Sequence, residues 1–258
     1  MKKFLLALTA LAAMTASASA ADLAARPYVK APLAPVAPNW TGFYIFGGAG
    51  GGIWDADSHS TRFGVPTIDH RVGGDGWFGT VGIGYDYQVN PTWVFGVFAD
   101  GQFGSLRGNI DDTFAAFSGR IKEQDAWAAG ARVGYLVAPN VLSYVNAGYS
   151  GSHWSGTTLV STFSGADSGF HTNSFNRNGW FVGGGVENNL NIFGISAPGW
   201  FMKTEYRAAY YDRKDINVLV NGTNATTSDT VSFKPWVQTI STSLVYRFNW
   251  TGPIVAKY

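Results

Sequence analysis

Eight segments rich in aromatic, β-branched and glycine residues are separated along this chain by connections that alternate between short and long. The short ones carry turn chemistry, with Asn90-Pro91 in 88–92 and Pro139-Asn140 in 137–140, while 191–199 is moderate in length. The long ones are 55–75, 108–122, 156–177 and 213–234. An even number of strands joined in this way is the pattern of an outer-membrane barrel. The sequence therefore predicts an all-β fold, an eight-stranded antiparallel transmembrane up-and-down β-barrel with strands at 41–54, 76–87, 93–107, 123–136, 141–155, 178–190, 200–212 and 235–250.

Side chains in these segments alternate with the period of two that a β-strand imposes. In 200–212, Lys203, Glu205 and Arg207 share one face, while Met202, Thr204 and Tyr206 share the other. A charged side chain facing lipid at the midplane costs roughly 2–4 kcal/mol, so the charged faces are expected to point inward. Segment 41–54 gives no face preference, because glycine fills much of 47–52. The predicted inward charged residues are Asp86, Asp100, Arg132, Glu187, Lys203, Glu205, Arg207 and Arg247.

These four acids and four bases allow three interpretations. They form an ion-pair network that fills the lumen, they line a narrow water path, or they bind one small ligand. The first is favoured, because eight strands enclose little more than their own side chains and buried charges must pair. Lys203, Glu205 and Arg207 are expected to pair with inward charges on neighbouring strands. Inward glycines such as Gly82, Gly84, Gly183 and Gly185 argue the other way, since they leave room for water.

The ten tryptophans fall near the predicted strand ends, at two levels. Tryptophan prefers the interface between membrane and water, where its ring is buried and its N–H remains hydrated. The positions therefore predict two aromatic belts on the outer surface of the barrel.

The N-terminal residues have the pattern of a secretory signal peptide, predicted at 1–20. Lys2 and Lys3 precede an apolar run, and Ala18-Ser19-Ala20 gives a small-residue cleavage site. An Ala/Pro-rich periplasmic tether is expected at 21–39, the barrel at 40–250 and a C-terminal extension at 251–258. No later stretch is long and apolar enough to predict a transmembrane helix. Without Lys2 and Lys3, 16 basic residues stand against 17 acidic ones, which predicts no attraction to nucleic acid.

Catalytic and cofactor motifs are not found. The chain has no cysteine, no G-x-S-x-G, no H-E-x-x-H and no phosphate-binding glycine loop, so neither an enzyme nor a bound cofactor or metal is expected. His59, His70, His153 and His171 map to the long connections or their edges. Because imidazole is a common ligand, they are candidate haem-binding residues, but none has the spacing of a paired ligand set.

The two ends of the predicted barrel carry a family resemblance. The chain resembles small alpha-proteobacterial outer-membrane proteins in its signal peptide, its tether and the two ends of its barrel. The barrel begins with Asn39-Trp40-Thr41-Gly42-Phe43-Tyr44 and ends with Tyr246-Arg247-Phe248-Asn249-Trp250. These are immunogenic or porin-family proteins with an OmpA-like barrel. The resemblance implies a Gram-negative outer-membrane location and a structural role in envelope integrity and surface exposure.

The resemblance leaves the finer function open. Some relatives are linked to haem binding or solute passage, so a narrow pore for small solutes or a haem-binding surface receptor are the alternatives. Expected partners are outer-membrane lipid and lipopolysaccharide. The barrel-assembly machinery is expected to read the alternating aromatics of Leu244 to Phe248.

Overall fold

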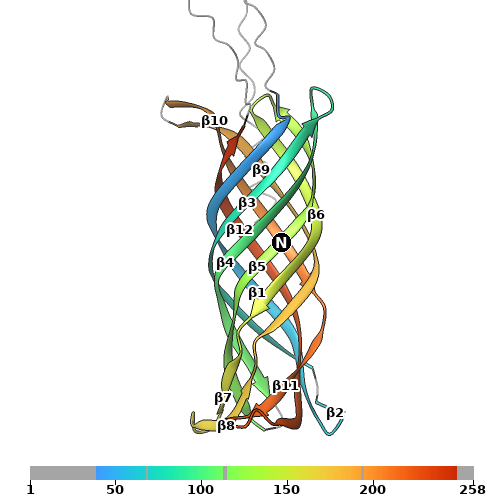
Figure 1. Cartoon of the computed structure of the whole chain (residues 1–258), viewed down its shortest axis with the longest axis vertical. Helices are drawn as coiled ribbons and strands as arrows, with labels where there is room; N and C mark the ends of the chain where they lie inside the picture. The colour runs from blue at the N-terminus through green and yellow to red at the C-terminus, as the bar shows by residue number, and fades with distance from the viewer. Residues whose placement is uncertain (1–38, 68, 113–114, 193–194, 249–258) are drawn as a thin grey trace, which may run out of the picture. The chain divides into compact units, whose positions relative to one another are not determined.

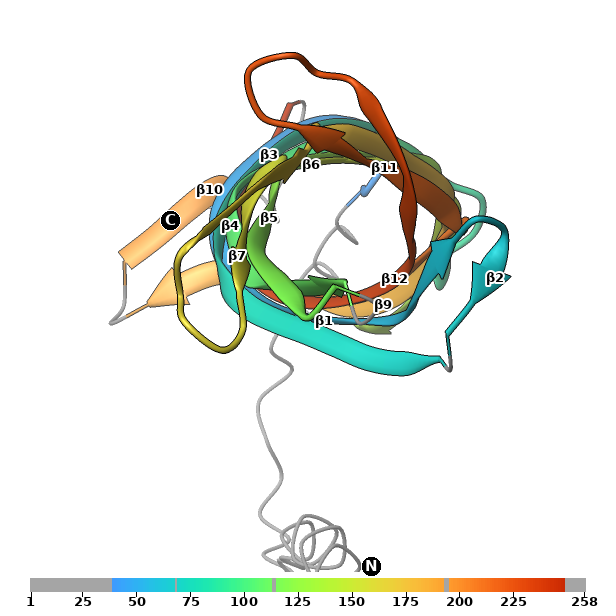
Figure 2. The ribbon, with the colours of Figure 1, turned by 90° about the horizontal axis from the view of Figure 1, so that it is seen from below.

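The structure, a computed structural model, describes residues 39–67, 69–112, 115–192 and 195–248, and its strands form a ring (Figures 1 and 2). The ring order is β1-β3-β4-β5-β6-β9-β10-β12, every neighbouring pair is antiparallel, and β12 pairs again with β1. These strands are Gly42–Arg62 (β1), His70–Gln88 (β3), Trp93–Asp112 (β4), Phe117–Ala138 (β5), Val141–Trp154 (β6), Phe175–Ile192 (β9), Ile195–Tyr211 (β10) and Thr226–Arg247 (β12). The predicted all-β class with eight antiparallel strands is confirmed. The predicted signal peptide, the tether up to residue 38 and the C-terminal extension lie outside the described residues.

The predicted long loops are wrong, because strands occupy most of their residues. β1 continues to Arg62, β4 to Asp112, and β12 already begins at Thr226. The remaining long connections hold four shorter strands, Val65–Pro66 (β2), Thr157–Ser161 (β7), Asp167–Thr172 (β8) and Lys214–Val220 (β11). Connection 191–199 is also mostly strand. Apolar side chains are still buried at inward positions along these extensions, as at Val72, Ile110, Ile121 and Val231, and their burial favours strand over loop.

The short strands extend the ring beyond the ends of β6, β9 and β10. β11 pairs with β12, β8 with β11, β7 with β8, and β7 also with β5. At the end of the molecule with the long hairpins, the strands between β12 and β5 are therefore β11, β8 and β7. Along the rest of the ring, the strands between β12 and β5 are β10, β9 and β6. Figure 1 shows this end at the bottom.

The opposite end of the ring holds the short turns. Residues 88–93 and 138–141 turn there, and the described chain starts and stops at the same end. Phe248 N–H donates to the Phe43 carbonyl, and the Trp40 indole N–H donates to the Pro139 carbonyl. No helix in the described part of the chain is both long and apolar enough to cross a membrane.

The outer surface of the ring is apolar between two levels of aromatic side chains. Cross-strand pairs make both levels, such as Trp93–Tyr135 and Trp200–Tyr246 near the short turns, and Trp127–Tyr149 and Trp180–Tyr210 toward the long hairpins. Exposed aliphatic side chains lie between them, including Val81, Ile83, Val97, Val145, Val186, Ile240 and Leu244. This surface matches an apolar band flanked by two aromatic belts.

Three of the tryptophans predicted for these belts lie inside the ring instead. Trp40, Trp54 and Trp154 are each no more than 2% exposed. For Trp54 and Trp154 the reason is strand parity, because they occupy inward positions of β1 and β6. Trp250 lies outside the described residues.

Candidate functional site in the lumen

All eight charged residues predicted to point inward lie inside the ring, each 7% exposed or less. They come from β3, β4, β5, β9, β10 and β12. The face of β1, which its glycines left undecided, is also fixed, because Tyr44, Phe46 and Trp54 are buried. These four acids and four bases divide into two groups.

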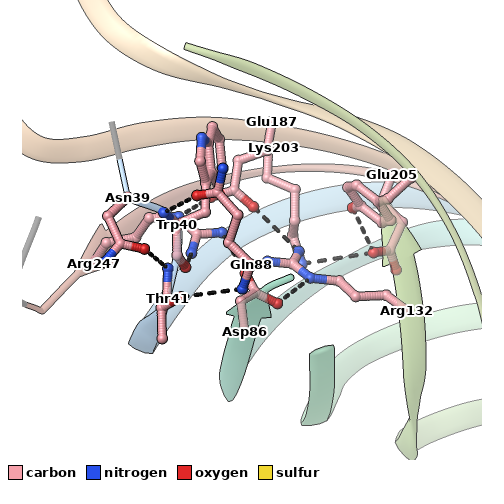
Figure 3. Close-up of polar contacts among 11 residues, drawn as sticks. Asn39, Trp40, Thr41, Asp86, Gln88, Arg132, Glu187, Lys203, Glu205 and Arg247 are labelled. Atoms are coloured by element: carbon pink, nitrogen blue, oxygen red, sulfur yellow. Dashed lines mark hydrogen bonds and ion pairs between the residues drawn. The ribbon is translucent and has the colours of Figure 1, made fainter. Parts of the chain in front are cut away.

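The first group, here called the turn-side quartet, consists of Asp86, Arg132, Glu187 and Arg247. Arg132 lies 2.5 Å from Asp86 and 3.2 Å from Glu187. Arg247 lies 2.8 Å from Asp86 and 2.7 Å from Glu187. Each arginine therefore contacts both acids and each acid contacts both arginines (Figure 3). The quartet carries no net charge, and charge-assisted bonds of this kind are the strongest available to buried ionic groups.

The second group, the central quartet, consists of Asp100, Lys203, Glu205 and Arg207. Two N–H groups of Arg207 donate to the two oxygens of Asp100, at 2.9 and 2.6 Å, and one of them also donates to Glu205 at 2.8 Å. The other Glu205 oxygen accepts from the Tyr144 hydroxyl and the Asn146 amide and lies 3.7 Å from Lys203 Nζ. Lys203 Nζ also lies 3.4 Å from the centre of the Phe46 ring. This quartet is neutral as well.

Most of these pairs join strands that are not neighbours in the ring. In the described ranges none of Lys203, Glu205 and Arg207 contacts an opposite charge on a flanking strand, contrary to the expectation. Arg207 of β10 reaches Asp100 of β4, although β9 and β12 are the strands that flank β10. The registers explain this difference. The cross-strand partners of Glu205 are Ser241 and Gly185, which offer it no opposite charge. Glu205 instead contacts Lys203 and Arg207 on its own strand, and Arg207 reaches across the bore to Asp100.

Trp40 lies in the lumen at the end with the short turns, which sequence parity did not predict. Its ring packs on Phe201 at 5.0 Å, and the Arg247 guanidinium lies 4.4 Å from its centre. The Trp40 carbonyl accepts from Arg247, and its backbone N–H donates to Gln88 (Figure 3). Trp40 therefore covers the turn-side quartet from the side of the short turns.

An aromatic cluster fills the lumen toward the long hairpins. It consists of Trp54, Trp154, Phe175 and Phe233, all buried, with ring centres 5.0 to 6.4 Å apart. Edge-on contacts such as Trp54–Trp154 are the preferred geometry of aromatic pairs. The two quartets thus lie between Trp40 and this cluster.

The inward glycines do not leave the gaps that the sequence raised as an alternative. A Cβ atom added at Gly84 would lie 2.3 Å from the Tyr44 ring, and one at Gly82 would lie 2.3 Å from the Phe46 ring. Large side chains of β1 therefore occupy the space that these glycines open. The side chains of Asn146 and Tyr144 likewise occupy the space beside Gly183 and Gly185, respectively.

Glu123 is a buried lumen acid that the sequence reasoning missed. Its side chain is 6% exposed, and one carboxyl oxygen has no hydrogen-bond partner. A β-bulge explains the omission, because the register of β5 against both neighbours shifts beside Glu123. Two cavities of about 10 Å³ border this residue. That volume is about enough for one water molecule.

The four histidines do not come together. His59 contacts Asp69, His153 contacts Asn176 and His171 contacts Asn221, while His70 lies on β3. In the described ranges no group of three or more histidines or acids has the geometry to hold a metal ion.

The ring of antiparallel strands, its apolar band with two aromatic belts and its polar interior define a small transmembrane β-barrel of the outer-membrane type. The model of the outer membrane protein beta-barrel domain matches residues 6–248, so the chain belongs to this family. The family resemblance and the outer-membrane location predicted from the sequence are therefore confirmed.

Individual relatives agree with this family, and the chain is also similar to solved structures of other outer-membrane proteins. The 31 kDa outer-membrane immunogenic protein of Brucella melitensis biotype 1 is 30% identical over 261 residues, which cover 93% of this chain and 98% of that protein. The protein of the same name from Brucella suis biovar 1 matches equally. Neisserial surface protein A is 15% identical, with a TM-score of 0.39 over 81% of this chain and 98% of that one. The outer membrane protease OmpT from Escherichia coli is 9% identical, with a TM-score of 0.42 over 83% and 99%.

Proposed function

We propose that this protein is a structural, non-enzymatic component of the outer membrane whose lumen is plugged by its two ionic quartets. The observation that carries the proposal is the pairing itself. The eight charges of the two quartets sum to zero and are arranged as two neutral groups, with Trp40 on one side and the aromatic cluster on the other. A charge-selective channel would instead need a ring of one sign.

The outer surface and the long hairpins support the rest of this role. The apolar band would contact lipid, and the charged hairpins beyond the belt with Trp127 and Trp180 would meet lipopolysaccharide and the cell exterior. The barrel-assembly machinery would recognise two outward aromatic side chains, Tyr246 on β12 and Phe248 just after it. The alternative of a haem-binding receptor is less well supported, because the four histidines do not come together and His59, His153 and His171 each contact a different polar side chain.

Solute passage tests the proposal directly. Purified protein refolded into liposomes should give no faster swelling in an isotonic solution of a small sugar than protein-free liposomes do, whereas a general porin in a parallel preparation should give rapid swelling. Swelling at a rate that rises with the amount of folded protein would support the pore alternative instead.

A further inference from the structure

A cavity of about 550 Å³ opens at the end of the lumen with the long hairpins. We call it the cup. It lies where β8 and β11 take part in the ring, and the side chains used in the argument below are Arg62, Asp112, Phe117, Phe170, Val218 and Asp229. They come from six strands, β1, β4, β5, β8, β11 and β12. Its volume lies in the range of small-molecule sites.

The cup has a buried floor. The next inward residues on three of its strands are Ser60, Ile110 and Val231, and each is no more than 1% exposed. The aromatic cluster with Trp54 and Phe233 lies below them on the same strands. The cup is therefore a site in its own right, whatever the lumen below it conducts.

Aromatic rings form one wall of the cup. Phe117 and Phe170 stack with their centres 5.7 Å apart and their planes at 29°. The buried side chain of Val218 continues this wall. An aromatic face attracts cations as well as apolar groups, because the ring carries negative charge density on its faces.

Among the described residues that line the cup, two are acids, Asp112 and Asp229, and one is a base, Arg62. Arg62 donates to both oxygens of Asp229, at 2.8 and 2.5 Å. These hydrogen bonds lower the pKa of the Asp229 carboxyl, which lies beyond the belt and outside the membrane-spanning part of β12. Asp112 is a second lining acid, and its charge also acts on Arg62. Two carboxylates thus share one guanidinium beside an aromatic wall.

We propose that the cup binds a small organic cation, an ammonium or guanidinium group carried on an aromatic or other apolar body. The apolar part would lie on Phe117 and Phe170, and the cation would lie near the carboxylates of Asp112 and Asp229. These two acids would disfavour an anionic ligand, and none of the four histidines is among the described residues that line the cup.

Three matched probes test the proposal on the folded, full-length mature protein in non-ionic detergent. Benzylammonium, benzyl alcohol and phenylacetate share a ring but differ in charge. Ligand-observed NMR, with protein-free micelles as the blank, should show saturable binding of benzylammonium, at least about fivefold weaker binding of benzyl alcohol, and none of phenylacetate. Equal binding of the three probes, or no saturable binding of benzylammonium, would overturn the proposal.

Two variants place the site. Asp112→Asn should weaken benzylammonium binding at least about fivefold, whereas Asp215→Asn, at an exposed acid of β11 outside the cup, should leave it unchanged. Asp229→Asn serves the same purpose if Asp112→Asn does not refold, as judged by circular dichroism. Unchanged binding in a folded cup variant, or an equal loss in Asp215→Asn, would show that the cation binds elsewhere.

Discussion

Glu205 is the residue on which the central quartet depends most. It accepts hydrogen bonds from Arg207, Tyr144 and Asn146 and lies next to Lys203. With Glu205 removed, Asp100 alone would face two buried cations. Buried charges that lose a partner are costly because the lumen cannot solvate them as water does.

We therefore predict that Glu205→Ala lowers the free energy of unfolding by about 3–5 kcal/mol, and less if water enters the lumen. Glu205→Gln keeps the shape and the hydrogen-bonding capacity and should cost less. Tyr206→Ala is the matched control on the outer face of the same strand and should act only through lost packing and the loss of its hydrogen bond to Gln238. Urea titrations of folded protein in lipid vesicles measure all three. Equal and negligible effects of Glu205→Ala and Glu205→Gln would argue for a hydrated lumen.

Gly84 of β3 tests the packing of the lumen, and Gly79, on the outer face of the same strand, is its control. A methyl group at Gly84 would press against the Tyr44 ring, which lies beneath the Arg132 guanidinium at 4.4 Å. At Gly79 the nearest atoms lie 3.8 Å or more from the added carbon. We predict that Gly84→Ala costs about 1–3 kcal/mol and that Gly79→Ala is close to neutral in the same titration. If both variants were neutral, the space beside Tyr44 would be larger than the structure shows.

At the scale of elements, the hairpins are sheet rather than loop, so few peptide bonds in them are accessible. β7 pairs with β8 and with β5, and β8 also pairs with β11. The unpaired part of this hairpin is therefore its tip around Phe163, which is 90% exposed. Proteases need several residues of unpaired chain, and such stretches remain at hairpin tips. The tips at 162–166 and 221–225 are the clearest examples.

We predict that proteases added to intact cells cut the protein at 162–166 or 221–225, and not at the short turn 137–140. The reason is that an even number of strands puts all long hairpins on one side, which we place outside, and all short turns in the periplasm. Mass spectrometry of the released peptides identifies the sites. Cleavage at 137–140 in cells with an intact outer membrane would invert this topology.

The strands themselves were predictable where lipid sets the pattern and less so beyond it. Between the belts, apolar outward and polar inward positions alternate, and this alternation indicated the eight inward charges and the long strands other than β1, whose glycines hide the pattern. Beyond the belts the outward face is polar as well, as at Arg71 and Lys234, so the extensions look like loops. The inward position of Glu123 was not predicted for a related reason, because the register shift at the bulge breaks the alternation from which inward positions were inferred.

At the scale of the whole molecule, the contacts across the lumen could not be read from the sequence. Parity places a side chain inside the ring but does not say which strand it will meet on the far side. The division into two neutral quartets depends on the stagger between strands, which brings Asp86 to Arg247 and Asp100 to Arg207. The place of Trp40 depends on the chain entering the lumen before β1 begins, and strand alternation says nothing about such a segment.

The central claim, that the quartets and the aromatic residues on either side of them plug the barrel, concerns the whole molecule and is tested most directly by single-molecule conductance in planar lipid bilayers. Eight strands enclose a bore that inward side chains nearly fill, whereas aqueous porin channels need about 16 strands. We predict that monomeric wild-type protein shows no stable open level, and that Asp86→Ala, which leaves Arg132 and Arg247 underpaired, adds brief leak events. A stable, large conductance from wild-type monomer that Asp86→Ala leaves unchanged would show that the protein is a pore.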